Sequence, residues 1–487
     1  MPYVYSEDTA MKGSTNSFVF KAAEQGIVSV SVTAPEGVSV AGRTVTAKAS
    51  GQTTQTRTIP SGAMSVAFSL PAGTWTFSVD LPSSSYKTSS KTQTVADEGS
   101  YSVQLVIEAF HVYGFRIAVN TADPAARVTY PETIFGQANL AYGKAPASGT
   151  GANCMNDWAG CELITGIKRQ YITSGSPVFT DVTDKRAAEE GYFNTSSQNW
   201  KDVMTYVPTW WMKMTNDGTN IDCAFSETQL DESWKDYAGS VGSNHVGHFR
   251  VGCFAANKPQ SSYTPIYSTG GVVPTTGEDV IGYINFAKYR GTGYDIMTWY
   301  QWTYLAALAV LLYKSADLQT AMARGYVDGS SMQSETALTF TNDYGMAGST
   351  SGTQQMAFFW IQNLWGNMIQ VVGGAKTDSS YRLMTCTGYS PTYSDSDFDK
   401  TSLSPSLSSN LNGYFSDVVG TTDAGFFPTN AAGSGSFFDW GTVDSSCYSE
   451  VGGYYGDGKF AGPFSISFSG RNGYPSSYVG SRLSYRL

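Results

Sequence analysis

A strict alternation of apolar and hydroxyl side chains near the C-terminus constrains what this chain can fold into. The alternating residues are Phe464, Ser465, Ile466, Ser467, Phe468 and Ser469. A period of two is typical of a β-strand with one buried and one exposed face. Leu483, Tyr485 and Leu487 repeat the pattern after a loop rich in Gly and Ser. We therefore expect residues 437–487 to contain strands that each have a buried and an exposed face.

The residues between these apolar positions have the composition of a contact surface. From 437 to 487 they are mostly Tyr, Ser, Gly, Asn and Asp. Tyr provides a large amphipathic area at a low cost in side-chain entropy, and Ser, Asn and Gly provide adaptable hydrogen bonding. We expect this stretch to be the binding surface and the rest of the chain to support it.

The charge of the chain argues against a nucleic-acid partner. Only 14% of its 487 residues are charged, against roughly 25% in ordinary globular proteins, and the net charge is −10. Binding to a phosphate backbone normally requires a basic surface. A protein or glycan ligand fits this charge better.

The six cysteines are too few for a disulfide scaffold in a chain of this length. We expect each to be a small buried residue, with a Cys154–Cys161 pair as the alternative. The first residues lack the basic and apolar regions of a secretory signal. The longest apolar run, Tyr304 to Tyr313, is about half of a bilayer span. These features predict cytoplasmic synthesis, no membrane insertion, and release by another route, such as a particle freed on lysis.

The pattern of turns divides the chain. Residues 1–16 are polar and are expected to form an arm. Residues 17–110 are expected to form a β-sandwich, with strands separated by turns such as Pro71-Ala72-Gly73. The predicted strands are Ile27–Thr33, Arg43–Ala49, Met64–Leu70, Thr74–Asp80 and Tyr101–Ile107. The phrase LPAGTWTFSVD resembles strand pairs of immunoglobulin-like or prealbumin-like modules.

The rest of the chain is expected to be one α+β unit, with a β-rich part at 111–289 and a final part at 290–487. Thr205–Asn216 is predicted to be a half-buried strand. Thr298–Tyr313 has the spacing of a helix that packs on a core, and Ser315 is predicted to cap a second helix, Ala316–Arg324. Residues 377–435 have little periodicity. They are either disordered or ordered surface loops, and their Tyr and Phe content favours ordered loops.

Three fragments resemble the C-type lectin fold of the formylglycine-generating-enzyme type. Asn363-Leu364-Trp365-Gly366-Asn367-Met368 resembles its Asn-hydrophobic-Gly-Asn segment, and Val479-Gly480-Ser481-Arg482-Leu483 resembles its closing strand. The helix that begins TWYQW lies at the position of the family's helix. The resemblance covers about 290–487 and implies a C-type-lectin-like domain with long loop insertions.

Within that group, the chain is most similar to the variable proteins of diversity-generating retroelements, which include receptor-binding tail proteins of phages and prophages. The resemblance implies a scaffold of Gly462, Pro463, Phe464, Gly480, Ser481, Arg482 and Leu483. It implies displayed ligand contacts at Ser445, Ser446, Tyr448, Glu450, Tyr454, Tyr455, Asp457, Lys459, Ser465, Ser467, Arg471, Asn472, Tyr474, Ser477 and Tyr478.

The function that follows is non-catalytic recognition of a host-surface protein or glycan by a protein of the virion tail. The N-terminal region would contact other tail proteins, and a homotrimer is implied by analogy alone. Formylglycine-generating oxidases use two cysteines that bind copper near the closing strand. Only Cys447 lies in that region here, so we expect no such activity and no cofactor. A glycan hydrolase, which needs two carboxylates, and a purely structural virion protein remain the alternatives.

Two groups of residues carry donors that metals use. His245, His248 and Cys253 could bind a transition metal, but neighbouring glycines favour a strand or loop and a hydrogen-bonding role. Asp395, Asp397, Asp399 and Asn410 offer oxygens to a cation, and a solvated loop is the favoured interpretation. We therefore predict no metal site.

Overall fold

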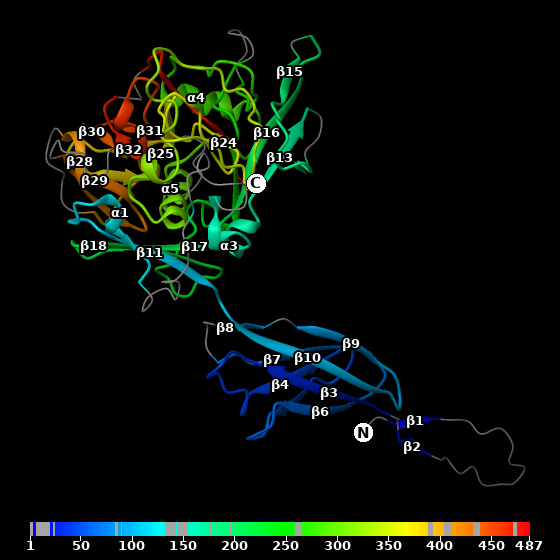
Figure 1. Ribbon diagram of the computed structural model, residues 1–487. Coiled ribbons are helices and arrows are strands. Elements are labelled where there is room, and N and C mark those ends of the chain that lie inside the picture. The colour runs from blue at the N-terminus through cyan, green and yellow to red at the C-terminus, as the bar shows by residue number, and fades with distance from the viewer. Residues whose placement is uncertain are drawn as a thin grey trace, which may run out of the picture. The chain divides into compact units, whose positions relative to one another are not determined.

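The computed structural model describes residues 3–5, 20–22, 25–82, 86–88, 90–131, 143, 154–174, 178–194, 196–258, 265–387, 393–403, 411–431, 439–470 and 475–487. The described chain is mostly β-structure with few helices. Its internal contacts divide it into two compact units, Met1–His111 and Val112–Leu487. Both units are drawn in Figure 1.

The first unit contains two four-stranded sheets that share one core. One sheet has the order β6-β3-β10-β8 and the other β5-β4-β7-β9, with β3 and β10 paired in parallel. The strands are β3 (Gly26–Thr33), β4 (Thr44–Lys48), β5 (Gln55–Thr58), β6 (Ser65–Leu70), β7 (Gly73–Val79), β8 (Tyr86–Thr88), β9 (Lys91–Val95) and β10 (Ser100–Ala109). Trp75 and Phe77 on β7 and the valines of β3 fill the core between the sheets.

The sequence predicts five of these strands within a residue or two and misses the three most polar ones. In β5 and β9 most side chains are exposed, so neither strand has the apolar alternation that identified the others. The N-terminal arm expected at 1–16 contains a short strand, β1 (Tyr3–Tyr5), which pairs with β2 (Phe20–Ala22). The remainder of that arm lies outside the described residues.

The second unit is built from four main sheets (Figure 1). The first has the order β12-β11-β18-β17, from β11 (Val112–Ala118), β12 (Val128–Thr129), β17 (Trp211–Asn216) and β18 (Asn220–Ser226). The second has the order β14-β13-β16-β21-β34-β22, with β15 on β16, from β13 (Lys168–Thr173), β14 (Thr180–Asp181), β15 (Tyr192–Asn194), β16 (Asn199–Pro208), β21 (His248–Gly252), β22 (Tyr294–Ile296) and β34 (Leu483–Tyr485).

The third and fourth sheets carry the C-terminal stretch. The third has the order β27-β26-β25-β31-β32, with β33 on β25, from β25 (Ile369–Thr377), β26 (Leu383–Thr385), β27 (Asp399–Lys400), β31 (Tyr448–Gly452), β32 (Gly462–Ser467) and β33 (Val479–Gly480). The fourth has the order β29-β28-β30, from β28 (Leu411–Thr421), β29 (Gly425–Ala431) and β30 (Trp440–Val443). Two small hairpins pair β19 (Ser240–Val241) with β20 (Asn244–His245) and β23 (Ala357–Phe358) with β24 (Ile361–Gln362).

The helices of the second unit are short apart from two. They are α1 (Pro124–Arg127), η2 (Asn156–Trp158), α3 (Glu162–Thr165), α4 (Val280–Lys288), α5 (Trp299–Tyr313), α6 (Leu318–Ala321), η3 (Asp395–Asp397) and η4 (Gly458–Phe460). Within the described residues, none is both long and apolar enough to span a bilayer.

Helix α5 is the centre of the second unit's core. The predicted helix is present, and Thr298 is its N-cap, in a reciprocal capping arrangement with Gln301. All fifteen of its residues are buried, because β11, β25, β29 and α6 all pack against it. Trp299 Nε1 donates to the Ala424 carbonyl at 2.7 Å, and Gln301 Oε1 accepts from Ser484 Oγ at 2.9 Å.

Two predicted elements differ from the structure. The second helix is shorter than expected, and its N-cap is Asp317, whose carboxylate accepts from Thr320 N at 3.1 Å, rather than Ser315. The strand expected at Thr205–Asn216 is interrupted after Pro208, so β16 and β17 lie in different sheets. Proline has no N–H to donate to a ladder, which makes it a natural end for a strand.

The expectation of one buried and one exposed face is wrong for the last strand. β34 lies between β21 and β22, one strand in from the edge of its sheet. Leu483 and Ser484 are both completely buried, and only Leu487 is well exposed. An interior strand that is covered on both faces loses the alternation of exposure, although the sequence alternates.

The described parts of 377–435 form strands as well as loops. β28 and β29 form a hairpin whose Phe415, Val418, Phe426 and Phe427 are buried in the main core. In these described residues the aromatic side chains belong to an ordered sheet rather than to the surface loops that were expected. The six cysteines are free thiols, including Cys154 and Cys161, so the alternative disulfide is not formed.

Candidate ligand-binding pocket

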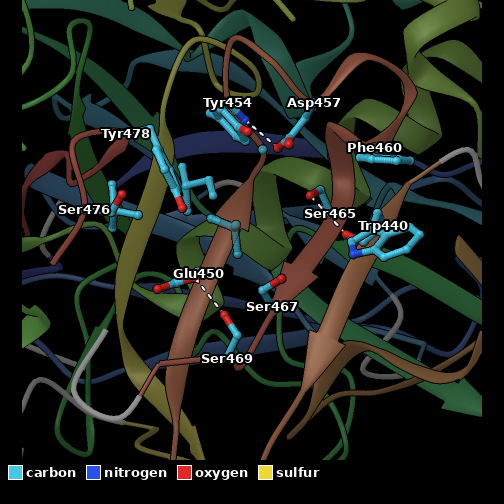
Figure 2. Close-up of a pocket in the computed structure, with 14 residues that line it drawn as sticks. Trp440, Glu450, Tyr454, Asp457, Phe460, Ser465, Ser467, Ser469, Ser476 and Tyr478 are labelled. Carbon is cyan, nitrogen blue, oxygen red and sulfur yellow. Dashed lines mark hydrogen bonds between the residues drawn. The ribbon is translucent and has the colours of Figure 1, made fainter. Parts of the chain in front are cut away.

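The alternation in β32 separates a core face from a pocket face. Phe464 packs edge-on against Phe426 at 5.2 Å, and Phe468, just beyond the strand, lies 5.4 Å from Phe427. The serines point the other way and line a pocket of about 370 Å³ (Figure 2). The residues that line it are Ile369, Trp440, Glu450, Val451, Gly453, Tyr454, Asp457, Phe460, Ser465, Ser467, Ser469, Ser476, Tyr478 and Val479.

Aromatic pairs stand on two sides of the pocket. Figure 2 shows Tyr454 and Tyr478 on one side and Trp440 and Phe460 on the other, with serines between them. The Tyr454 and Tyr478 rings stack at 4.5 Å with 22° between their planes. The Trp440 and Phe460 rings lie 4.7 Å apart. All four side chains are half-buried. Within each pair one ring supports the other, and both still present ring surface to a ligand.

A tight loop positions Tyr454 and Asp457. Gly452 and Gly453 have φ values of 91° and 72°, and a side chain at Gly453 would lie 2.7 Å from Ala461. Glycine is therefore required for the turn from β31 into the loop. Asp457 Oδ2 accepts a hydrogen bond from Tyr454 N at 2.8 Å and closes this loop.

Two carboxylates line the pocket. Burial raises the pKa of Asp457 to about 6, and the Tyr454 N–H offsets only part of that rise. Glu450, on β31, is 4% exposed, and its Oε2 accepts from Ser469 Oγ at 3.4 Å. The pocket thus combines hydroxyl donors, acceptors and negative charge.

The residues expected to be scaffold are buried, and Arg482 among them makes several hydrogen bonds. The Arg482 guanidinium donates to the Gly252 carbonyl at 2.9 Å, the Gln362 carbonyl at 2.7 Å and Gln370 Oε1 at 2.9 Å. Arg482 also donates to the Asn363 carbonyl. The motif Asn363–Met368 is therefore in direct contact with the closing segment. β33 pairs in parallel with the start of β25.

Six of the fifteen predicted contact residues line the pocket together: Glu450, Tyr454, Asp457, Ser465, Ser467 and Tyr478. Glu450 and Ser465 are not displayed as expected, since they are only 4% and 8% exposed. The strands on either side and Trp440 cover them, and Ser465 Oγ donates to the Trp440 carbonyl at 3.2 Å. A ligand can contact Glu450 and Ser465 only from inside the pocket.

The other predicted residues are placed elsewhere or are not described. Those that do not line the pocket are Ser445, Ser446, Tyr448, Tyr455, Lys459 and Ser477. Tyr448 packs against Phe398 and a separate apolar cluster, and Lys459 borders a smaller pocket of about 160 Å³. Arg471, Asn472 and Tyr474 lie outside the described residues.

Sequence reasoning missed part of the lining. Trp440, Phe460, Ser469 and Ser476 line the pocket but were not predicted as contacts. Ser469 continues the alternation of Ser465 and Ser467, so that pattern could have found it. Trp440 lies on β30 in a different sheet, and no local pattern indicates that it reaches this site.

The metal-binding candidates have hydrogen-bonding partners. His245 Nδ1 lies 2.8 Å from Asp236 Oδ2, and this hydrogen bond raises the pKa of His245. His248 Nδ1 lies 3.2 Å from the Val246 carbonyl, and Cys253 is buried. Across the described residues, no group of three or more His, Cys, Asp or Glu is arranged to hold a metal ion.

In the acidic loop, Asp395 pairs with Lys376, and Asp397 Oδ2 accepts from Ser394 N at 2.7 Å. Asp399 is exposed. Asn410 lies outside the described residues. Two of the proposed cation ligands are therefore engaged in ordinary loop contacts.

Comparisons with known proteins give little further information. No protein-family model matches the chain, and no curated protein matches it. The Bacillus anthracis TIE protein aligns with 45% of this chain and 35% of its own at 11% identity, with a TM-score of 0.17. A leucine-rich repeat protein from Bacteroides thetaiotaomicron aligns with 42% of this chain and 25% of its own at 11% identity, with a TM-score of 0.14. Both alignments are too weak to assign the chain to a family.

Proposed function

We propose that this chain is a non-catalytic receptor-binding protein that recognises a protein or glycan on a host-cell surface through the pocket on β31 and β32. The observation that carries the proposal is the pairing of aromatic walls with a floor of serines (Figure 2). Half-buried aromatic rings provide contact area on a rigid support, and hydroxyls adapt their hydrogen bonds to a ligand. The pocket volume of about 370 Å³ lies at the lower end of the range for small-ligand sites, roughly 300–1,000 Å³.

We propose further that the second unit is a C-type-lectin-like domain of the formylglycine-generating-enzyme type, as in the variable proteins of diversity-generating retroelements. The order of the three sequence fragments supports this, as do the bonds from Arg482 to Gln362 and Asn363. The setting would be a phage or prophage tail, with the first unit attached to other tail proteins.

A steric block tests the binding function. Ser467→Trp would place an indole in the pocket, and we expect binding of the labelled chain to a panel of bacterial strains to fall at least tenfold in flow cytometry. Ser243→Trp is the matched control, because Ser243 is exposed in the turn between β19 and β20. Tyr454→Ala combined with Tyr478→Ala removes one aromatic wall and checks the result independently.

The outcomes separate the alternatives. A thermal transition near that of the original chain shows that a variant is folded. If folded pocket variants bind cells as well as the original does, the pocket is not the binding site. If the original chain binds no strain, a purely structural virion role is favoured instead.

A glycan hydrolase is the second candidate, because Glu450 and Asp457 both line the pocket and the pKa of Asp457 is raised to about 6. A raised carboxyl pKa suits a general acid. Incubation with host surface polysaccharide and an assay for new reducing ends decides between the two functions. Sustained turnover that Glu450→Gln or Asp457→Asn abolishes would overturn the non-catalytic proposal.

Diversification is tested in the DNA. A near-repeat of the codons for residues 437–487 that differs only at adenines, together with a reverse-transcriptase gene, would support a diversified surface. Without that repeat, the proposal becomes an adhesin of fixed specificity.

A further inference from the structure

We propose that the ligand is a neutral glycan of at least two sugar units, and that it occupies two neighbouring pockets. The first is the pocket on β31 and β32. The second, called the side pocket from here on, has a volume of about 160 Å³ and is lined by Asp317, Gln319, Thr320, Arg324, Thr350 and Lys459. The inference rests on the proposed receptor-binding function and specifies the chemistry and length of its ligand.

A single short turn separates the two pockets. Asp457 and Phe460 line the pocket on β31 and β32, and Lys459, which lies between them in the sequence, lines the side pocket. Helix α6 holds this turn, because Gln319 Nε2 donates to the carbonyl of Lys459 at 3.1 Å and also to the carbonyl of Ala461. A ligand that crosses the turn from one pocket therefore enters the other.

Charges of both signs surround this turn. Glu450 and Asp457 are acidic, and Lys459 brings a positive charge to the same turn. Both acids already accept hydrogen bonds within the protein, Glu450 from Ser469 Oγ and Asp457 from Tyr454 N. The site therefore does not select a ligand by one sign of charge.

The side pocket is polar, and its charges are also paired. Every described residue that lines it has a polar side chain. Arg324 Nη1 donates to Asp328 at 2.6 Å, and Asp317 accepts from Thr320 N at 3.1 Å. Thr320 and Thr350 are exposed, and a hydroxyl can both donate and accept. These features suit a ligand that is rich in hydroxyls and carries no net charge.

A sugar also matches the pocket on β31 and β32. A pyranose ring has an apolar C–H face, which can pack on aromatic rings, and hydroxyls around its edge. Figure 2 shows aromatic rings on two sides of the pocket and the side chains of Ser467 and Ser469 between them. A carboxylate has about four acceptor positions, so Asp457 can accept from a sugar hydroxyl as well as from Tyr454 N.

A neutral glycan fits the two pockets together better than other ligands. Each sugar unit carries hydroxyls, so one kind of ligand supplies partners to both pockets, whereas a peptide needs a different suitable side chain for each. An acidic glycan would meet Glu450, Asp457 and Asp317 as well as Lys459, in a chain of net charge −10. Like charges then oppose its binding.

The first test measures the gain with ligand length. Methyl glycosides of glucose, galactose and mannose, the homodisaccharide of each, and the corresponding uronic acid disaccharides are titrated into the full chain by ligand-observed NMR. We expect at least one neutral disaccharide to bind at least tenfold more tightly than its own monosaccharide and than its uronic acid counterpart. The absence of any such disaccharide would overturn the proposal.

The second test assigns that gain to the side pocket. Thr350→Trp fills the side pocket from an exposed position, and the ratio of disaccharide to monosaccharide affinity should fall below twofold. Ser243→Trp is the matched control and should leave this ratio at tenfold or more. Thr320→Trp is the second variant, and circular dichroism verifies that each variant is folded. An unchanged ratio in both folded variants would overturn the role of the side pocket.

Cell binding separates failure of this inference from failure of the proposed function. Periodate cleaves the vicinal diols of glycans, and proteinase K removes surface proteins. If periodate-treated cells are bound as before and proteinase-treated cells are not, the glycan is refuted and the receptor-binding function stands. Loss of binding after periodate alone supports the glycan. If a disaccharide binds but no cell does, the receptor function fails and the glycan site stands.

Discussion

Asp457 closes a loop of the pocket and also makes the stability of the chain depend on pH. Its Oδ2 holds Tyr454 N at 2.8 Å, and burial raises its pKa from 3.8 to about 6. Between these two values the folded chain retains a proton that the unfolded chain has released. The contribution of Asp457 to the free energy of unfolding therefore decreases as the pH rises from about 4 to about 6, and it is constant above that range.

We predict that Asp457→Asn removes this pH dependence. The amide oxygen can still accept from Tyr454 N, so the loop remains closed. The thermal midpoint of the original chain should decrease relative to that of the variant as the pH is raised from 4 to 6. Asp399→Asn, at an exposed position, should behave like the original chain. Parallel curves for the original chain and Asp457→Asn would contradict the burial of this carboxyl.

At the scale of elements, the closing strand depends on one buried cation. Arg482 is completely buried, and its three donor nitrogens contact carbonyls of Gly252 and Gln362 and the side chain of Gln370. The partners come from three separate segments. Arg482 thus connects the second sheet, the β23–β24 hairpin and the third sheet.

We predict that Arg482→Lys lowers the free energy of unfolding by about 3 kcal/mol or more. A lysine ammonium cannot reproduce the planar set of donors, and the carbonyls that lose their partners stay buried. Arg382→Lys is the control, since Arg382 is a partly exposed ion-pair partner of Asp378 and pairs of that kind contribute about 1 kcal/mol at most. Urea denaturation measures both. An equal effect of the two substitutions would contradict the role of Arg482.

At the scale of the whole molecule, local patterns in the sequence predict local structure and fail for distant pairings. The alternation in β3 and β7 and the cap at Thr298 could be identified because neighbours in the sequence determine them. The placement of β34 between β21 and β22 could not, since more than two hundred residues separate Val251 from its partner Ser484. Trp440 could not be identified as a pocket residue either, because it lies on β30 in a neighbouring sheet.

The division into two units predicts that ligand recognition belongs to the second one alone. Among the described residues, those that line the pocket all lie between Val112 and Leu487, and the described members of the two apolar clusters of this unit all lie in the same range. We expect a fragment of residues 112–487 to bind cells within twofold of the full chain and to lose that binding in Ser467→Trp as the full chain does. A folded fragment that no longer binds cells would show that the first unit takes part in recognition. Retention of cell binding would leave attachment to a partner as the role to test for the first unit.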